Sequence, residues 1–170
     1  MRRQRLLVTI ASMIVMLGSG GTDLNACGDK FLRIGRSPRF KAYAAVHRAS
    51  ILLFVPPSAT RSAVNEFESA LKRAGHRPLT VRTMNAFSDA LGATKYDIVI
   101  AIFPDAVRLK EYAAAASSKP DVLPILDRPA KAELAEAQRE YGHVLKAGAT
   151  KYETLAEIDH VMQGRLTGRP

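Results

Sequence analysis

Tryptophan is absent from this sequence of 170 residues, and aromatic residues together make up only 6% of it. A core must therefore be built mainly from Leu, Ile, Val and Ala, which suits a parallel sheet covered by helices. Hydrophobic residues make up 47% and charged residues 24%, a balance that argues against a disordered chain. The length accommodates one globular domain and leaves little room for two.

The sequence also has no apolar run of the roughly 20 residues that a membrane-spanning helix needs. Its first apolar run covers residues 6–17, follows Arg2, Arg3 and Arg5, and precedes a glycine-rich stretch. A basic start, a short apolar centre and a small-residue exit are typical of a signal peptide. We therefore expect residues 1–26 to direct export. The alternative is a buried core helix.

Cysteine occurs once, at Cys27, so no intrachain disulfide can form. The preceding residues, Leu24-Asn25-Ala26, give a sequence that resembles a bacterial lipobox. The resemblance implies a diacylated Cys27 as the new N-terminus, and two acyl chains give stable membrane anchoring. The same residues also suit ordinary signal-peptidase cleavage after Ala26. The expected location is therefore periplasmic, or on the outer membrane as a lipoprotein.

Basic residues exceed acidic ones, giving a formal net charge of +9. Such a charge favours acidic partners such as nucleic acid or anionic lipid, and predicted export removes nucleic acid from that group. Residues 27–49 form a basic N-terminal arm that could face lipid head groups or simply pack on the domain.

Strand and helix patterns alternate five times within residues 50–166, before a short tail at residues 167–170. Continuous apolar runs predict two fully buried strands at 51–55 and 97–103, and alternation predicts a less buried strand at 77–82. Two more strands are expected at 122–126 and 143–146. Apolar periodicity and capping residues predict helices at about 58–74, 85–91, 105–116, 130–141 and 150–162.

This order predicts a three-layer α/β/α sandwich around a five-stranded parallel sheet. The two fully apolar strands should be central, because a central parallel strand is buried on both faces. The alternating strand at 77–82 should lie at an edge.

Three stretches, FESALKRAGHRPLTV, KYDIVIAIFPD and HVLKAGATKYETLAEIDHVM, resemble the receiver domain of bacterial response regulators. The first resembles that family's first helix and second strand, the second its third strand, and the third its last strand and helix. The resemblance covers roughly residues 50–166. It implies a flavodoxin-like fold with strand order 2-1-3-4-5.

The family's phosphorylation chemistry does not carry over to this sequence. The position of the phosphoacceptor aspartate matches Ile102, and Val55-Pro56-Pro57 stands in place of the metal-binding acidic pair. The expected Ser or Thr falls near Leu126, while the family's lysine is matched by Lys146. Without a carboxylate nucleophile, aspartyl-phosphate chemistry is not possible at this position. The resemblance thus implies a degenerate receiver without catalytic residues, metal or cofactor.

Ligands of open parallel sheets bind at the carboxyl ends of the strands. The candidate binding residues at that edge are Pro57, Ser58, Phe103, Asp105, Asp127 and Lys146. The three charged residues among them could converge as a cluster. The alternative is that Lys146 forms a salt bridge and that the two aspartates cap helices.

Three functions follow as hypotheses. The first is a non-catalytic interaction or sensing module of the cell envelope, with a protein partner bound near residues 146–162 and Tyr112. The second is a protein that binds a small anionic ligand at the strand ends. The third is an enzyme that uses Lys146 with Asp105 or Asp127, and no complete catalytic constellation supports it.

Overall fold

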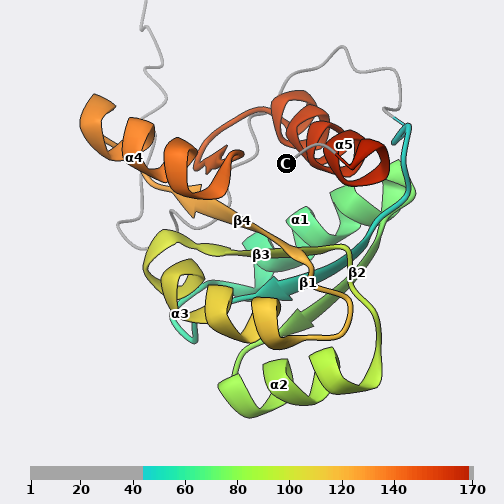
Figure 1. Ribbon diagram of the computed structural model, residues 1–170. Coiled ribbons are helices and arrows are strands. Elements are labelled where there is room, and N and C mark those ends of the chain that lie inside the picture. The colour runs from blue at the N-terminus through green and yellow to red at the C-terminus, as the bar shows by residue number, and fades with distance from the viewer. Residues whose placement is uncertain (1–43, 169–170) are drawn as a thin grey trace, which may run out of the picture.

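The computed structural model describes residues 44–168, in which five strands and five helices alternate (Figure 1). The predicted leader, Cys27 and most of the predicted basic arm lie outside the described residues. The elements in chain order are β1 (Ser50–Phe54), α1 (Arg61–Ala74), β2 (Arg77–Val81), α2 (Met84–Ala93), β3 (Ile98–Ile102), α3 (Phe103–Ala115), β4 (Asp121–Leu126), α4 (Lys131–Tyr141), β5 (Leu145–Lys146) and α5 (Lys151–Thr167).

All five strands are parallel, in the order β2-β1-β3-β4-β5. Leu52 at the centre of β1 is in register with Leu79 of β2 on one side and Val99 of β3 on the other. The predicted three-layer, flavodoxin-like fold is therefore confirmed. The two fully apolar strands are central, and the alternating strand is at an edge, as the pattern indicated.

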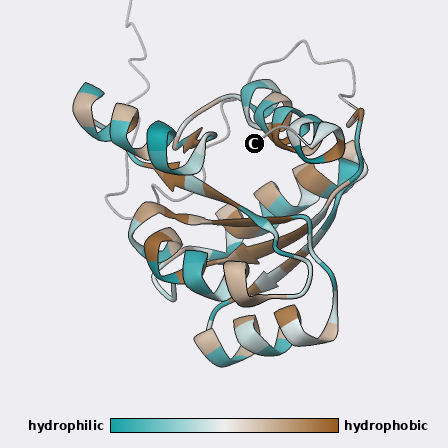
Figure 2. Cartoon of the chain, in the orientation of Figure 1, coloured by the Kyte–Doolittle hydropathy of each residue, from teal (hydrophilic) through white to brown (hydrophobic). Residues whose placement is uncertain are grey.

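Side chains alternate across the sheet, and each face is covered by its own helices. Ile51 and Leu53 pack with residues of α1 and α5, whereas Leu52 and Phe54 pack with residues of α2 and α3. Figure 2 shows the hydrophobic colours gathered on the strands between these layers. A smaller cluster joins Ala137 of α4 to Leu126, the last residue of β4, and to Phe103, the first residue of α3. Ala137 is the only buried residue of α4, and each of the other four helices has at least two.

Several predicted element boundaries were wrong. The strand expected to end at Phe103 ends at Ile102, because Pro104 favours the first turn of α3. Helix α2 is capped by Thr83 rather than Asn85, since the Thr83 hydroxyl accepts the Ala86 N–H at 3.2 Å. Strand β5 has only two residues, and α5 continues to Thr167 rather than ending near residue 162.

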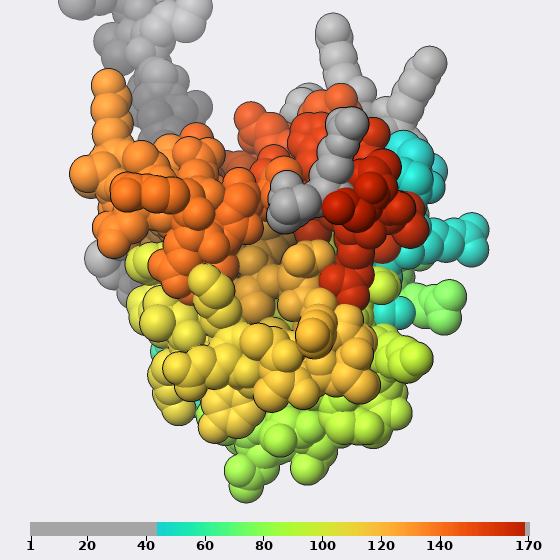
Figure 3. All heavy atoms as spheres, viewed as in Figure 1, coloured from blue at the N-terminus to red at the C-terminus, as the bar shows by residue number. Residues whose placement is uncertain are grey.

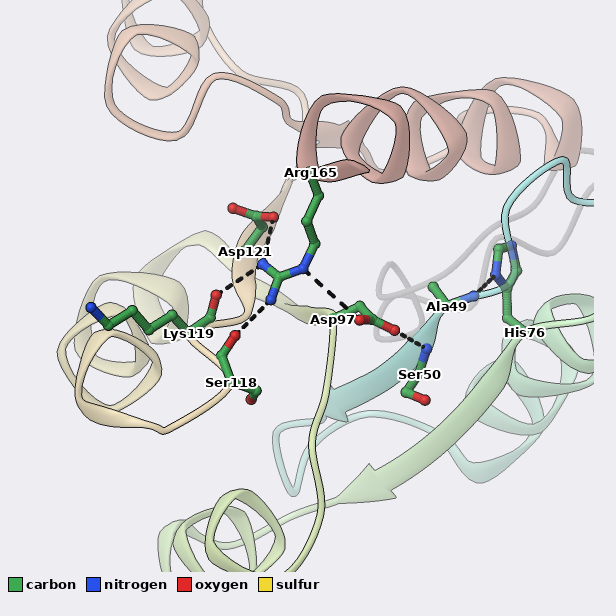
Figure 4. A network of polar contacts seen from close by, with 8 residues as sticks. All are labelled: Ala49, Ser50, His76, Asp97, Ser118, Lys119, Asp121 and Arg165. Carbon is green, nitrogen blue, oxygen red and sulfur yellow. Dashed lines mark hydrogen bonds and ion pairs between the residues drawn. The ribbon is translucent and has the colours of Figure 1, made fainter. Parts of the chain in front are cut away.

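Arg165 explains why α5 extends so far (Figure 4). Its guanidinium donates to the carbonyl oxygens of Ser118 at 2.6 Å and Lys119 at 2.9 Å, and to the Asp121 carboxylate at 3.1 Å. Its Nε also lies 3.9 Å from a carboxylate oxygen of Asp97. The last turn of α5 is thereby tied to the residues that precede β3 and to the beginning of β4.

A second polar contact holds residues 44–49, here named the N-terminal strap, at the amino ends of the strands. The buried Asp159 of α5 accepts the backbone N–H groups of Val46 and His47 at 3.3 and 3.2 Å. His76 is 3% exposed, and its Nδ1 accepts the Ala49 N–H at 3.2 Å (Figure 4). This hydrogen bond requires a neutral ring with its proton on Nε2.

Burial lowers the pKa of His76 below its ordinary value of 6.5, and the negative charge of Asp159 opposes this effect. Nε2 is buried and has no hydrogen-bond partner within residues 44–168. Protonation of Nδ1 would also place two donors, the ring N–H and the Ala49 N–H, against each other. The folded domain therefore favours the neutral ring.

Replacing Arg165 with Met should lower the free energy of unfolding by about 1–3 kcal/mol, because the carbonyls of Ser118 and Lys119 lose their donor. Urea denaturation of the full chain measures the change. Arg139→Met, on the exposed side of α4, is the matched control and should change stability by no more than about 0.5 kcal/mol. Equal losses in the two variants would contradict the role given to Arg165.

Acidification should weaken the fold through His76. The unfolded chain takes up the proton first, so stability is full above pH 6.5 and is lost as pH falls toward the lower pKa of the folded state. Denaturation between about pH 7.5 and pH 5 should show a steeper loss for the native chain than for His76→Gln, whose amide oxygen can still accept the Ala49 N–H. His160→Gln, at an exposed position, should retain the native pH dependence. Parallel curves for the native chain and His76→Gln would refute this assignment.

Candidate functional site

A cavity of about 380 Å³ opens at the carboxyl ends of β1, β3 and β4. We name it the strand-end cavity, and its volume lies within the range of small-molecule sites. Most of its lining is apolar. The lining residues are Pro56, Ser58, Ala59, Ile102, Phe103, Pro104, Ile125, Leu126, Asp127, Glu133 and Ala147.

The parallel sheet brings these residues together from five separate segments. Ile102 and Leu126 end the neighbouring strands β3 and β4, and Pro56 follows β1. Ala147 follows β5, and Glu133 belongs to the first turn of α4. Because all strands run the same way, their carboxyl ends and the following loops meet at one edge of the sheet.

An aromatic contact holds one wall of the cavity in place. The rings of Phe103 and Tyr141, at the end of α4, form a T-shaped contact with ring centroids 6.2 Å apart. Lys110 Nζ lies 4.8 Å from the centre of the Tyr141 ring and 3.1 Å from the Glu140 carboxylate. Burial of the Tyr141 hydroxyl raises its pKa, and the charge of Glu140 adds to this effect. These contacts connect α3 and α4 behind Phe103.

The structure brings together three of the six residues that the sequence nominated. Ser58, Phe103 and Asp127 line the strand-end cavity. Pro57 is exposed in the turn after β1, and Asp105 is half-buried in the first turn of α3; neither is a lining residue.

Lys146 is also outside the lining, because it is exposed on β5 while its neighbour Leu145 is buried. Adjacent side chains of a strand point to opposite faces of the sheet, and on β5, the edge strand, the face of Lys146 is exposed while that of Leu145 is covered.

The predicted charged cluster does not form. Within residues 44–168, no ion pair joins Lys146 to Asp105 or Asp127. Asp127 instead lies 3.6 Å from Arg128 Nε. Neither aspartate is a helix cap, since the N-cap positions of α3 and α4 are occupied by Ile102 and Ala130. The enzyme hypothesis built on Lys146 consequently loses its geometric basis.

Sequence analysis missed Glu133, the second carboxylate of the cavity. The residue lies in a helix rather than at the end of a strand, so a search of strand ends passes over it. The available signal was its place three residues after the N-cap of α4, where acidic side chains are favoured by the helix dipole.

The receiver resemblance assigns the phosphoacceptor position to an apolar residue, and the side chains around that residue are apolar as well. Ile102 is the last residue of β3 and lines the cavity beside Phe103 and Pro104. Among residues 44–168, no group of three or more His, Cys, Asp or Glu side chains is arranged to hold a metal ion. The strand-end cavity thus presents apolar surface at the place where a receiver presents its reactive carboxylate.

No protein-family model matches the chain, and the searches of curated proteins and of solved structures found no match either. The fold assignment therefore rests on strand order and register, and the site assignment on the lining of the cavity. No helix between residues 44 and 168 is long and apolar enough to cross a membrane.

Proposed function

We propose that this protein is a non-catalytic, receiver-like sensing module of the bacterial cell envelope that binds a small ligand in the strand-end cavity. The observation that carries the proposal is the cavity itself, with Ile102 at the acceptor position. In a receiver this edge of the sheet changes state when phosphorylated. Here a bound molecule would take the place of the phosphoryl group as the signal.

The composition of the cavity supports binding rather than covalent chemistry. Eight of its eleven lining residues are apolar, and its polar groups are the Ser58 hydroxyl and the carboxylates of Asp127 and Glu133. A nucleophile needs an adjacent base or a lowered pKa to become reactive, and no histidine or lysine lines this cavity to serve Ser58. Apolar walls with a few polar groups are the usual composition of a ligand pocket.

The envelope location is supported by the sequence of the leader. An export signal at residues 1–26 would deliver the domain across the inner membrane, where it would stay in the periplasm or be anchored by acyl chains on Cys27. A sensing module in that location would pass its signal to a protein partner rather than to nucleic acid.

The two parts of the expected partner surface lie on opposite sides of the sheet. Sequence analysis grouped Tyr112 with residues 146–162, but Tyr112 belongs to α3, and its ring packs against Phe87 of α2 at 6.5 Å. Figure 3 shows α5 in red at the upper right and α3 in yellow below, on separate parts of this face. We therefore propose α5 alone as the partner surface, where Tyr152 is 53% exposed.

A small neutral probe should enter the strand-end cavity. Benzyl alcohol, added to the isotopically labelled full chain, should shift the backbone NMR signals of Ile102, Leu126 and Ala147. Ser58→Trp should abolish these shifts, because an indole at this exposed lining position fills the opening. Ser88→Trp, at an exposed position on α2, should leave them intact. Shifts that are absent, or that persist unchanged in Ser58→Trp, would overturn the cavity as the binding site.

The envelope assignment predicts the N-terminus of the mature protein. Expression of the full chain in a bacterium, followed by intact mass measurement, should yield a protein that starts at Cys27. A mass increase matching acyl chains indicates the lipoprotein route, and its absence indicates ordinary cleavage. Recovery of a chain that still starts at Met1 would contradict export through this leader.

A further inference from the structure

The charged side chains that line the strand-end cavity are both negative. Asp127 follows β4 and Glu133 lies in the first turn of α4, so two separate elements each supply a carboxylate. No Lys, Arg or His side chain is among the lining residues. This arrangement is opposite to that expected for an anionic ligand, which the net charge of the chain had suggested.

Two neighbouring cations lie close to these carboxylates: Arg128, beside Asp127, and Arg82, whose guanidinium donates to the carbonyl oxygens of the lining residues Pro56 and Ala59 at 3.4 Å. Asp127 lies 3.6 Å from Arg128 Nε, but the two side chains are 48% and 72% exposed, and such exposed pairs contribute little. Glu133 makes no hydrogen bond or ion pair within residues 44–168. Its carboxylate is therefore available to a ligand.

The helices that begin at the cavity oppose the two carboxylates only in part. Helices α1, α3 and α4 begin there, and each helix start has a partial charge of about +0.5 that fades within one turn. Their combined charge is smaller than the two full negative charges. The lining itself thus offers a cation two carboxylates and offers an anion no basic side chain.

We propose that the strand-end cavity binds a small organic cation, a protonated amine carried on an apolar aryl or alkyl body. The ammonium group meets Asp127 and Glu133, and the apolar body lies against Ile102, Phe103 and Leu126. This inference rests on the proposed sensing function and specifies its ligand class. A bound cation would also connect the carboxyl end of β4 to the first turn of α4.

Three probes of the same shape test the charge preference. Benzylamine, benzyl alcohol and benzoate share one ring and differ in the charge of the head group, and NMR titration of the full chain measures their affinities. Benzylamine should bind about three- to tenfold more tightly than benzyl alcohol, and benzoate should bind most weakly. Added salt should weaken benzylamine binding and leave benzyl alcohol unchanged.

Carboxylate variants test the residues. Glu133→Gln and Asp127→Asn should each bring the affinity for benzylamine toward that for benzyl alcohol, while benzyl alcohol binding is retained and shows that the cavity is intact. Glu136→Gln is the matched control, because Glu136 is an exposed residue of the same helix that does not line the cavity. It should bind all three probes as the native chain does.

The outcomes separate this inference from the proposed function. Equal affinities for benzylamine and benzyl alcohol would overturn the cation preference and leave the cavity as a ligand site. Tightest binding of benzoate would overturn it in favour of an anionic ligand. Failure of all three probes to shift the signals of cavity residues would overturn both the cation preference and the sensing proposal.

Discussion

The burial of β1 and β3 on both faces is the constraint on which the rest of the structure depends. Residues 51–53 of β1 and 98–101 of β3 have no exposed surface. Full burial of each Leu or Ile side chain contributes about 1.5–3 kcal/mol, so exposing either face of these strands would cost more than a small domain can lose. Both faces must therefore be covered, which places α1 and α5 on one side and α2 and α3 on the other.

This constraint also explains which parts of the fold the sequence could predict. The central places of β1 and β3 and the edge place of β2 could be inferred because fully apolar and alternating strands have different places in a parallel sheet. The full order was implied by the receiver resemblance. The end of α5 could not, because Arg165 reaches carbonyl groups of Ser118 and Lys119, more than forty positions away in the chain. A local pattern holds no information about such a contact. The two-residue length of β5 likewise depends on its pairing with Ile125 and Leu126 rather than on its own composition.

The residues of the candidate site likewise divide into those that a local pattern predicts and those that depend on contacts between distant parts of the chain. Ser58, Phe103 and Asp127 could be predicted because they follow strand ends, and topology alone brings those ends together. Lys146 was nominated for its place at a strand end and for the family lysine that it matches, whereas in the structure Leu145 is buried and Lys146 is exposed, outside the lining of the cavity. Glu133 depends on how α4 packs across the end of β4, which only the three-dimensional structure shows.

The two ends of the sheet have different physical characters, and the difference bears on how a sensing domain could work. The amino end is fixed by the hydrogen bonds of Arg165 and His76 (Figure 4) and by those of Asp159. The carboxyl end is bordered by α4, which buries only Ala137 completely. Regions with few buried contacts open at the lowest free-energy cost. A ligand held between Asp127 and Glu133 would add contacts to α4, so binding would stabilise the element with the least support of its own. Ligand binding would then stabilise α4, at the carboxyl end of the sheet, while the contacts at the amino end remained unchanged.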